Sequence, residues 1–214
     1  MEPKRVRLPS ARFAARRCLT AGAVAAVGVV SLFSSSASAH MGTGLPGGAV
    51  SGFVHPFSGA DHLLAMVLVG VWGAFLGRPL IHVLPVVFPA MMVAGAIVGM
   101  FGVPLPPVEA GISLSVLVLG SCIALSIRAP VWAASLVVAV FAVFHGYAHG
   151  RELPSAADPV TYSAGFVLAT GLLHVSGIGI GLLNGRPKGI LVTRGFGGVT
   201  AALGVWFLYR AIGG

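Results

Sequence analysis

Six long apolar runs, separated by short polar or proline-containing gaps, make up the chain after residue 59. A bilayer core about 30 Å thick is crossed by about 20 helical residues, and each run is close to that length. The pattern predicts an all-α fold, a polytopic membrane helix bundle with spans near 60–77, 80–102, 108–127, 130–149, 160–183 and 190–212. The gaps are too short for a separate soluble domain, and residues 41–54 are expected to form a Gly-rich lead-in.

The first 39 residues have the three parts of a secretory signal. A basic segment ends at Arg17, an apolar stretch runs from Leu19 to Phe33, and Ala37-Ser38-Ala39 has the small residues of a cleavage site. We therefore predict a signal peptide over 1–39 and one membrane domain over 40–214. An uncleaved first helix is the alternative. With cleavage, the α-amine and imidazole of His40 could bind a metal together.

Composition excludes an ordinary soluble globule. Only 8% of residues are charged and 57% are hydrophobic, whereas soluble domains carry about 25% charged residues. The net charge of +8 does not indicate nucleic-acid binding, because six of the 13 Lys and Arg residues lie in the first 17 positions. Membrane lipid is the expected surrounding, no nucleic-acid partner is expected, and a homo-oligomer is left open. Cleavage would leave Cys122 as the only cysteine, which excludes a cysteine metal site and an intramolecular disulfide.

The loop charges predict an orientation. If cleavage leaves the mature N-terminus outside, the expected cytoplasmic ends carry five basic residues and the outer ends carry Arg151 and Arg210. The five are Arg78, Arg128, Arg186, Lys188 and Arg194. This asymmetry follows the positive-inside rule. It predicts a multi-pass protein of the cytoplasmic (inner) membrane of a bacterium, with its mature N-terminus on the outer face.

Two groups of ionisable residues interrupt the apolar pattern. His55, Asp61 and His62 open the first span, and a bend at Gly59 could bring His55 back toward Asp61. His145, His149 and Glu152 end the fourth span at i, i+4 and i+7, which places them on one helical face. Ionisable residues in membrane spans are costly and commonly mark ion pathways, and imidazole with carboxylate suits borderline divalent metals. A histidine pair that caps the helix at the membrane surface is the alternative for the second group.

Two further residues extend this pattern. Glu109 opens the third span, either as a ligand or as a loop carboxylate near the headgroups. His174 lies about 21 Å into the fifth span at 1.5 Å per residue, close to the midplane. The other candidates lie at outer ends, so the pattern suggests an external metal-capture vestibule that leads toward a central histidine.

Proline and glycine add structural expectations to the spans. Pro85 and Pro89 fall inside the second span, where each removes a backbone hydrogen bond. The freed carbonyl oxygens could line a path, or the prolines could only bend the helix. Gly95 with Gly99, and 177 with 181, form G-x-x-x-G pairs that allow helices to pack closely.

The chain resembles the HupE/UreJ family of nickel permease-like membrane proteins on its first motif and on three later elements. The first motif is His55-Pro56-x-x-Gly59-x-Asp61-His62-x-x-Ala65-Met66-x-x-Val69-Gly70. The later elements are Glu109 with Gly111, Ser113 and Ser115, then His145-Gly146-x-x-His149-Gly150-x-Glu152, then Leu172-Leu173-His174. The resemblance spans essentially the whole mature chain. Five residues separate His55 from Asp61, one more than in the similar histidine–aspartate–histidine motif of the wider nickel–cobalt transporters.

The resemblance implies uptake of nickel, sometimes cobalt, for enzymes such as hydrogenase or urease. It implies metal ligands among His55, Asp61, His62, His145, His149, Glu152, His174 and Glu109. The metal would be a transported substrate, with no permanently bound cofactor and no enzymatic activity. The alternatives are a metal-binding accessory or sensor protein without transport, a histidine-rich membrane metalloenzyme and a passive channel. The metalloenzyme would need more than the seven histidines present, and the channel would tolerate Asp61→Asn better than a metal site would.

Overall fold

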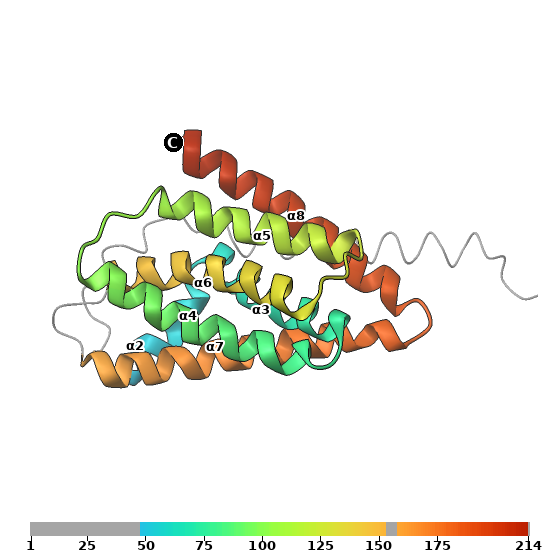
Figure 1. Cartoon of the computed structure of the whole chain (residues 1–214), viewed down its shortest axis with the longest axis horizontal. Helices are drawn as coiled ribbons and strands as arrows, with labels where there is room; N and C mark the ends of the chain where they lie inside the picture. The colour runs from blue at the N-terminus through green and yellow to red at the C-terminus, as the bar shows by residue number, and fades with distance from the viewer. Residues whose placement is uncertain (1–47, 153–157, 214) are drawn as a thin grey trace, which may run out of the picture. The chain divides into compact units, whose positions relative to one another are not determined.

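The computed structural model describes residues 48–152 and 158–213, except the side chain of Glu152. The described residues form helices and short connections, with no strand among them (Figure 1). The α-helices are α2 (Ala49–Val54), α3 (Ala60–Leu76), α4 (Leu80–Met100), α5 (Val108–Ala124), α6 (Val131–Glu152), α7 (Pro159–Gly181) and α8 (Gly189–Gly213). Two 3₁₀ turns, η1 (His55–Phe57) and η2 (Leu182–Gly185), follow α2 and α7. The predicted all-α fold is confirmed, and α3 to α8 coincide with the six predicted runs.

Fewer helices qualify as complete membrane spans than the sequence suggested. Four of the described helices are long and apolar enough to cross a membrane alone: α4, α6, α7 and α8. A fifth span results if α2 with η1 and α3, which meet at an angle of 86°, are counted as one broken span. Helix α5 has 17 residues and is therefore about 25 Å long, slightly short of the hydrocarbon core. Six helices are thus confirmed, and six full spans stay a prediction.

Helix α2 was not expected, because residues 41–54 read as a Gly-rich lead-in. Six residues are too few for an isolated helix to be stable in water, so packing against α7 must supply the stability. Two glycines allow this contact: a Cβ on Gly52 would overlap the carbonyl oxygen of Tyr162, and one on Gly165 would overlap that of Ala49. The contact that stabilises α2 therefore depends on two glycines that are 113 positions apart, and no local sequence pattern connects them.

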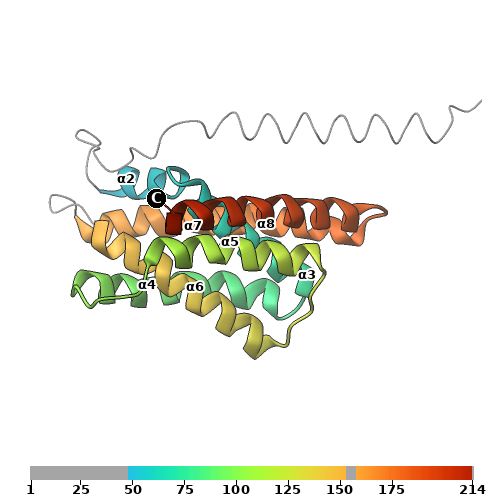
Figure 2. The same cartoon turned by 90° about the horizontal axis from the view of Figure 1, so that it is seen from above.

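Glycine also sets the contact between α4 and α6, which lie side by side (Figures 1 and 2). Gly95 and Gly99 meet the backbone of Val143 and Tyr147, and in return Gly146 meets the backbone of Met92. The packing role predicted for the first G-x-x-x-G pair is confirmed, and so is that of the second. Its members, Gly177 and Gly181, meet the backbone of α3 at Val67 and Val71.

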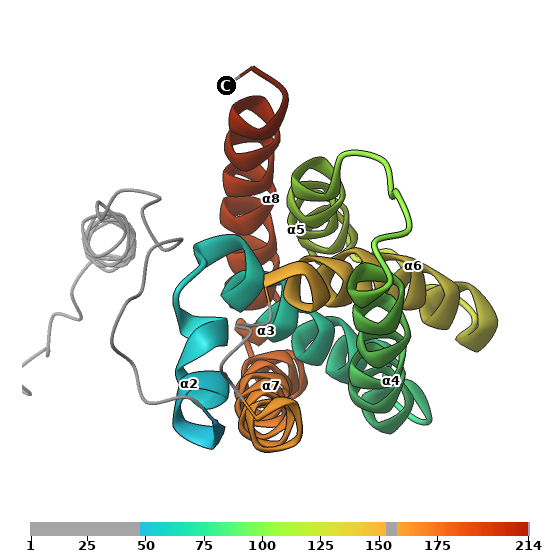
Figure 3. The ribbon, with the colours of Figure 1, turned by 90° about the vertical axis from the view of Figure 1, so that its left-hand side faces the viewer.

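Helix α3 lies in the middle of the bundle, as the end-on view of Figure 3 shows. It contacts α4, α5, α7 and α8, and residues 64–73 are all buried. This arrangement explains why its sequence is apolar on every side, since a helix surrounded by protein needs no polar face. It also places the polar start of α3, at Asp61 and His62, against the C-terminal part of α6.

Candidate metal-binding site

The break before α3 positions His55. The 3₁₀ turn at His55–Phe57 ends in a bend in which Ser58 Oγ donates a hydrogen bond to the carbonyl of His55 at 2.6 Å. Gly59 is extended, with φ −112° and ψ 121°, and α3 begins at the next residue. The bend expected at Gly59 is therefore present. It brings the His55 side chain to His149 of α6, with 3.1 Å between Nε2 and Nδ1.

Asp61 and His62 form a tightly held pair at the start of α3. Asp61 Oδ1 lies 2.9 Å from His62 Nδ1 and also accepts a hydrogen bond from the His62 backbone N–H at 2.8 Å. With the carboxylate as acceptor, Nδ1 carries the proton and the lone pair of the ring is at Nε2. A carboxylate that fixes the histidine tautomer in this way is the usual support of a metal-ligating imidazole.

His145 and His149 share the inward face of α6, as their spacing predicted. His145 is 0% exposed and His149 is 6% exposed, so neither caps the helix at a surface. His145 Nδ1 donates to the carbonyl of Phe141 at 2.9 Å, which leaves the lone pair at Nε2. The Nε2 atoms of both residues are buried and have no hydrogen-bond partner within the described residues. Buried polar atoms are normally paired, so these two atoms are suited to an exogenous ligand.

Together these five residues, His55, Asp61, His62, His145 and His149, form what we call the histidine cluster. The His62 ring contacts those of both His145 and His149, with centroid distances of 5.1 Å and 5.0 Å. The His55 ring also contacts that of His149, with a centroid distance of 4.8 Å. Four imidazoles and one carboxylate from three separate helical segments therefore meet in one place.

The spacing of nitrogens in the cluster bears on metal binding. Two nitrogens bound at about 2.1 Å to one ion lie about 3.0 Å apart in octahedral and about 3.4 Å apart in tetrahedral coordination. The 3.1 Å between His55 and His149 falls within that range, and it also suits a direct hydrogen bond. In the described part of the chain, no three His, Cys, Asp or Glu side chains are already arranged to hold an ion. Binding would therefore require small rotations of the rings.

Exposure within the histidine cluster decreases in one direction. The side chains of Asp61 and His62 are 22% and 16% exposed, whereas His145 is fully buried. A cation that approaches the start of α3 would meet the carboxylate first and the buried imidazoles afterwards. This order agrees with the expected vestibule, although the side of the membrane it faces stays a prediction.

Aromatic rings surround the histidine cluster, and the sequence analysis did not identify them. The Phe166 ring lies 4.5 Å from that of His149, and the Phe88 ring lies 5.4 Å from that of His145. A usable signal was present on α7, where Tyr162, Phe166, Thr170 and His174 follow each other at intervals of four residues. That interval places all four on one face, and all four are buried.

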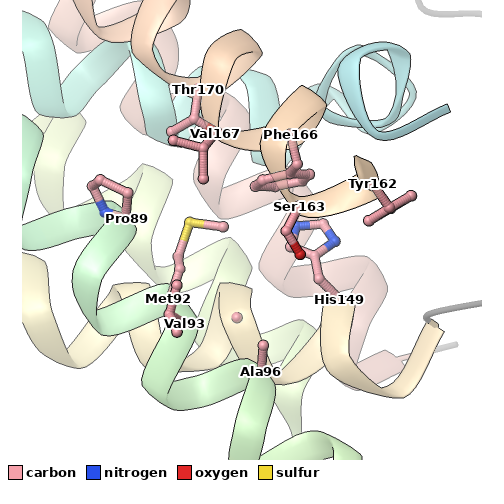
Figure 4. Close-up of a pocket in the computed structure, with 11 residues that line it drawn as sticks. Pro89, Met92, Val93, Ala96, His149, Tyr162, Ser163, Phe166, Val167 and Thr170 are labelled. Atoms are coloured by element: carbon pink, nitrogen blue, oxygen red, sulfur yellow. The ribbon is translucent and has the colours of Figure 1, made fainter. Parts of the chain in front are cut away.

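A pocket between α4, α6 and α7 ends at the cluster. Figure 4 shows Met92 extending from α4 toward Phe166 and Val167, with the imidazole of His149 beside Phe166 and Ser163. The lining is almost entirely apolar. Because a hydrated cation is costly to place in apolar surroundings, the pocket is not the expected ion route.

Three predicted site residues lie apart from the histidine cluster. His174 is buried on α7, and the Phe88 ring contacts both His174 and His145, at 5.4 Å from each imidazole. Glu109 is exposed in the first turn of α5. Glu152 ends α6, and its side chain, like His40 and the signal region, falls outside the described residues.

The chain is also similar to known proteins. The model of the family described as "HupE / UreJ protein" matches residues 26–207. A curated relative, "Protein HupE" of Rhizobium leguminosarum bv. viciae, is 42% identical over 174 residues, which cover 81% of this chain and 91% of the relative. No solved structure is significantly similar.

Proposed function

The chain belongs to the HupE/UreJ family of bacterial membrane proteins, and on that premise we propose that it is a secondary transporter that imports nickel, or cobalt, ions. The observation that carries the proposal is the histidine cluster, in which four imidazoles and one carboxylate meet among apolar helices. Such a group is expensive to bury, and a structural role would need far fewer polar side chains. We propose no catalytic role and no resident cofactor.

The donor set favours borderline divalent cations. Neutral imidazoles with one carboxylate suit nickel, cobalt and zinc better than magnesium or calcium, which prefer oxygen ligands. Asp61 supplies a single negative charge, so an ion is attracted but not neutralised. A transporter must also release its substrate, and several weakly held ligands allow this better than one rigid cage.

The energy source in this proposal is the membrane potential. It favours inward movement of a cation by about 2.3 kcal/mol per charge per 100 mV. The sequence contains no G-x-x-x-x-G-K-[ST] motif for nucleotide binding. The predicted inner-membrane location, the outward mature N-terminus and the cleaved signal belong to the same proposal, because they place the exposed side of the histidine cluster outside the cytoplasm.

A metal-binding accessory or sensor protein is the second candidate. It rests on the same histidine cluster, which could bind and deliver metal without passing it across the membrane. The two candidates differ in translocation, because both would bind nickel.

Nickel uptake by the purified protein distinguishes a transporter from an accessory or sensor protein. The full chain is reconstituted into liposomes, a negative internal potential is set, and radiolabelled nickel is added at sub-micromolar concentration. We expect potential-dependent accumulation that excess cobalt suppresses and magnesium does not. Nickel binding in detergent without accumulation in liposomes would favour the accessory role.

The same assay predicts a pH dependence. Only unprotonated imidazoles bind metal, so protons compete with nickel for the histidine cluster, and acidification from pH 7.5 to 5.5 is expected to lower initial uptake. His82 lies exposed on α4 outside the histidine cluster, so H82Q should keep the same pH profile. Uptake that increases as the outside becomes acidic would instead indicate proton-coupled import.

A further inference from the structure

His174 is a buried imidazole that the histidine cluster does not include. It is 1% exposed, and neither of its ring nitrogens has a hydrogen-bond partner among the described residues. An unpaired buried polar group destabilises the fold, and this ring has two. A buried histidine without partners is therefore suited to reversible binding of a ligand.

A backbone oxygen faces this imidazole. In α4, the residue four positions after Pro85 is Pro89, which has no N–H to donate to the Pro85 carbonyl. The Pro85 backbone lies beside the His174 ring, without meeting the geometry of a hydrogen bond to it. One imidazole nitrogen and one helix carbonyl without its usual partner are thus adjacent in the buried part of the bundle.

One aromatic ring contacts both this imidazole and the histidine cluster. Phe88 is fully buried, and its ring makes edge contacts with His145 at an interplanar angle of 61° and with His174 at 84°. Phe88 and Pro85 are three residues apart on α4 and therefore share a face. Phe88 is therefore in contact with both an imidazole of the histidine cluster and His174.

From this geometry we infer that His174 and the Pro85 carbonyl form an inner metal-binding station, and that Phe88 is the apolar barrier between it and the histidine cluster. The inference rests on the proposed function, which it deepens by dividing the route into an outer and an inner station. The inner station has fewer protein ligands, so water must complete its coordination, and it binds divalent nickel or cobalt more weakly. A weaker second station allows release after the tighter first one.

Equilibrium binding of radiolabelled nickel to the purified, untagged full chain in detergent tests the station itself. We expect two nickel ions per chain at saturation and one in H174Q, with the affinity of the tighter site changed less than about twofold. A wild-type stoichiometry of one, or an unchanged stoichiometry in H174Q, would overturn the inference.

Pro89→Ala is a second test, with a variant that is expected to fold normally. Alanine restores an N–H that can donate to the Pro85 carbonyl, and it removes a residue that strongly disfavours a helix interior. The protein should be at least as stable as the wild type, while the weaker site loses about tenfold in affinity and the tighter site is unchanged. Equal affinities for both sites in P89A and wild type would exclude the carbonyl as a ligand.

Phe88→Leu tests the barrier. We expect nickel stoichiometry to be unchanged and uptake into liposomes to increase severalfold, because leucine keeps the position apolar but opens part of the path. The matched control is F207L, at a partly buried phenylalanine on α8, which should leave both quantities unchanged. A joint loss of binding and uptake in F88L alone would show that Phe88 only supports packing. If the wild type accumulates no nickel at all, the transport proposal fails, while the stoichiometries still decide on the inner station.

Discussion

Asp61→Asn is expected to lower nickel uptake into intact cells about 10- to 100-fold, the range seen when the carboxylate that supports a metal-ligating histidine is removed. Asn keeps the size of Asp but removes the charge. The amide oxygen can still accept from the His62 backbone, yet it holds the imidazole proton at Nδ1 less firmly. The cation therefore loses its only charged ligand in the described cluster and a well-oriented imidazole at the same time.

Asp158→Asn is the matched control for this substitution. Asp158 caps α7 by accepting a hydrogen bond from the Val160 N–H at 3.0 Å, and Asn is an equally good cap. Uptake at equal membrane abundance should therefore match the wild type. A D61N protein that transports normally would exclude the histidine cluster from the route and favour the passive-channel alternative.

Gly146→Ala is expected to destabilise the protein and disturb the histidine cluster together. The new Cβ would overlap the carbonyl oxygen of Met92, so α6 must move away from α4. Overpacking of this kind costs about 1–3 kcal/mol, which corresponds to a decrease of roughly 2–12 °C in the midpoint of thermal unfolding for a chain of this size. His145 and His149 flank this glycine, so nickel binding should weaken as well.

Gly179→Ala makes the same chemical change where there is space for it. No atom lies within 4 Å of a Cβ at this exposed position on α7. Since alanine favours helix over glycine by about 1 kcal/mol, G179A should unfold at or slightly above the wild-type midpoint. Unfolding of G146A at the G179A midpoint would show that the close contact between α4 and α6 is not required.

Much of the fold was predictable because each apolar run is a local signal. Hydrophobicity over about 20 residues reports burial in lipid, and it gave the positions of α3 to α8. It did not predict the residue at which α5 ends, and it did not predict α2. Both depend on neighbours: α2 is a six-residue helix whose stability comes from backbone contact with α7 at Gly52 and Gly165.

The candidate site was also only partly predictable from the sequence. Spacing along one helix correctly placed His145 and His149 on a common face. Spacing did not predict contacts between segments, because periodicity carries no information on which helices are neighbours. The partner of His55 is thus His149, 94 positions away, and Phe88 contacts both His145 and His174.

By itself, the sequence determined that this is an all-α membrane protein with imidazoles and carboxylates at the ends of its apolar runs, since these properties depend on local composition and helical period. The resemblance in its motifs also identified the family. Only the tertiary structure decided which of these residues meet. Glycine contacts between helix backbones bring α2, α6 and α7 around the start of α3, so five candidates form the histidine cluster, Glu109 stays exposed, and His174 lies behind Phe88.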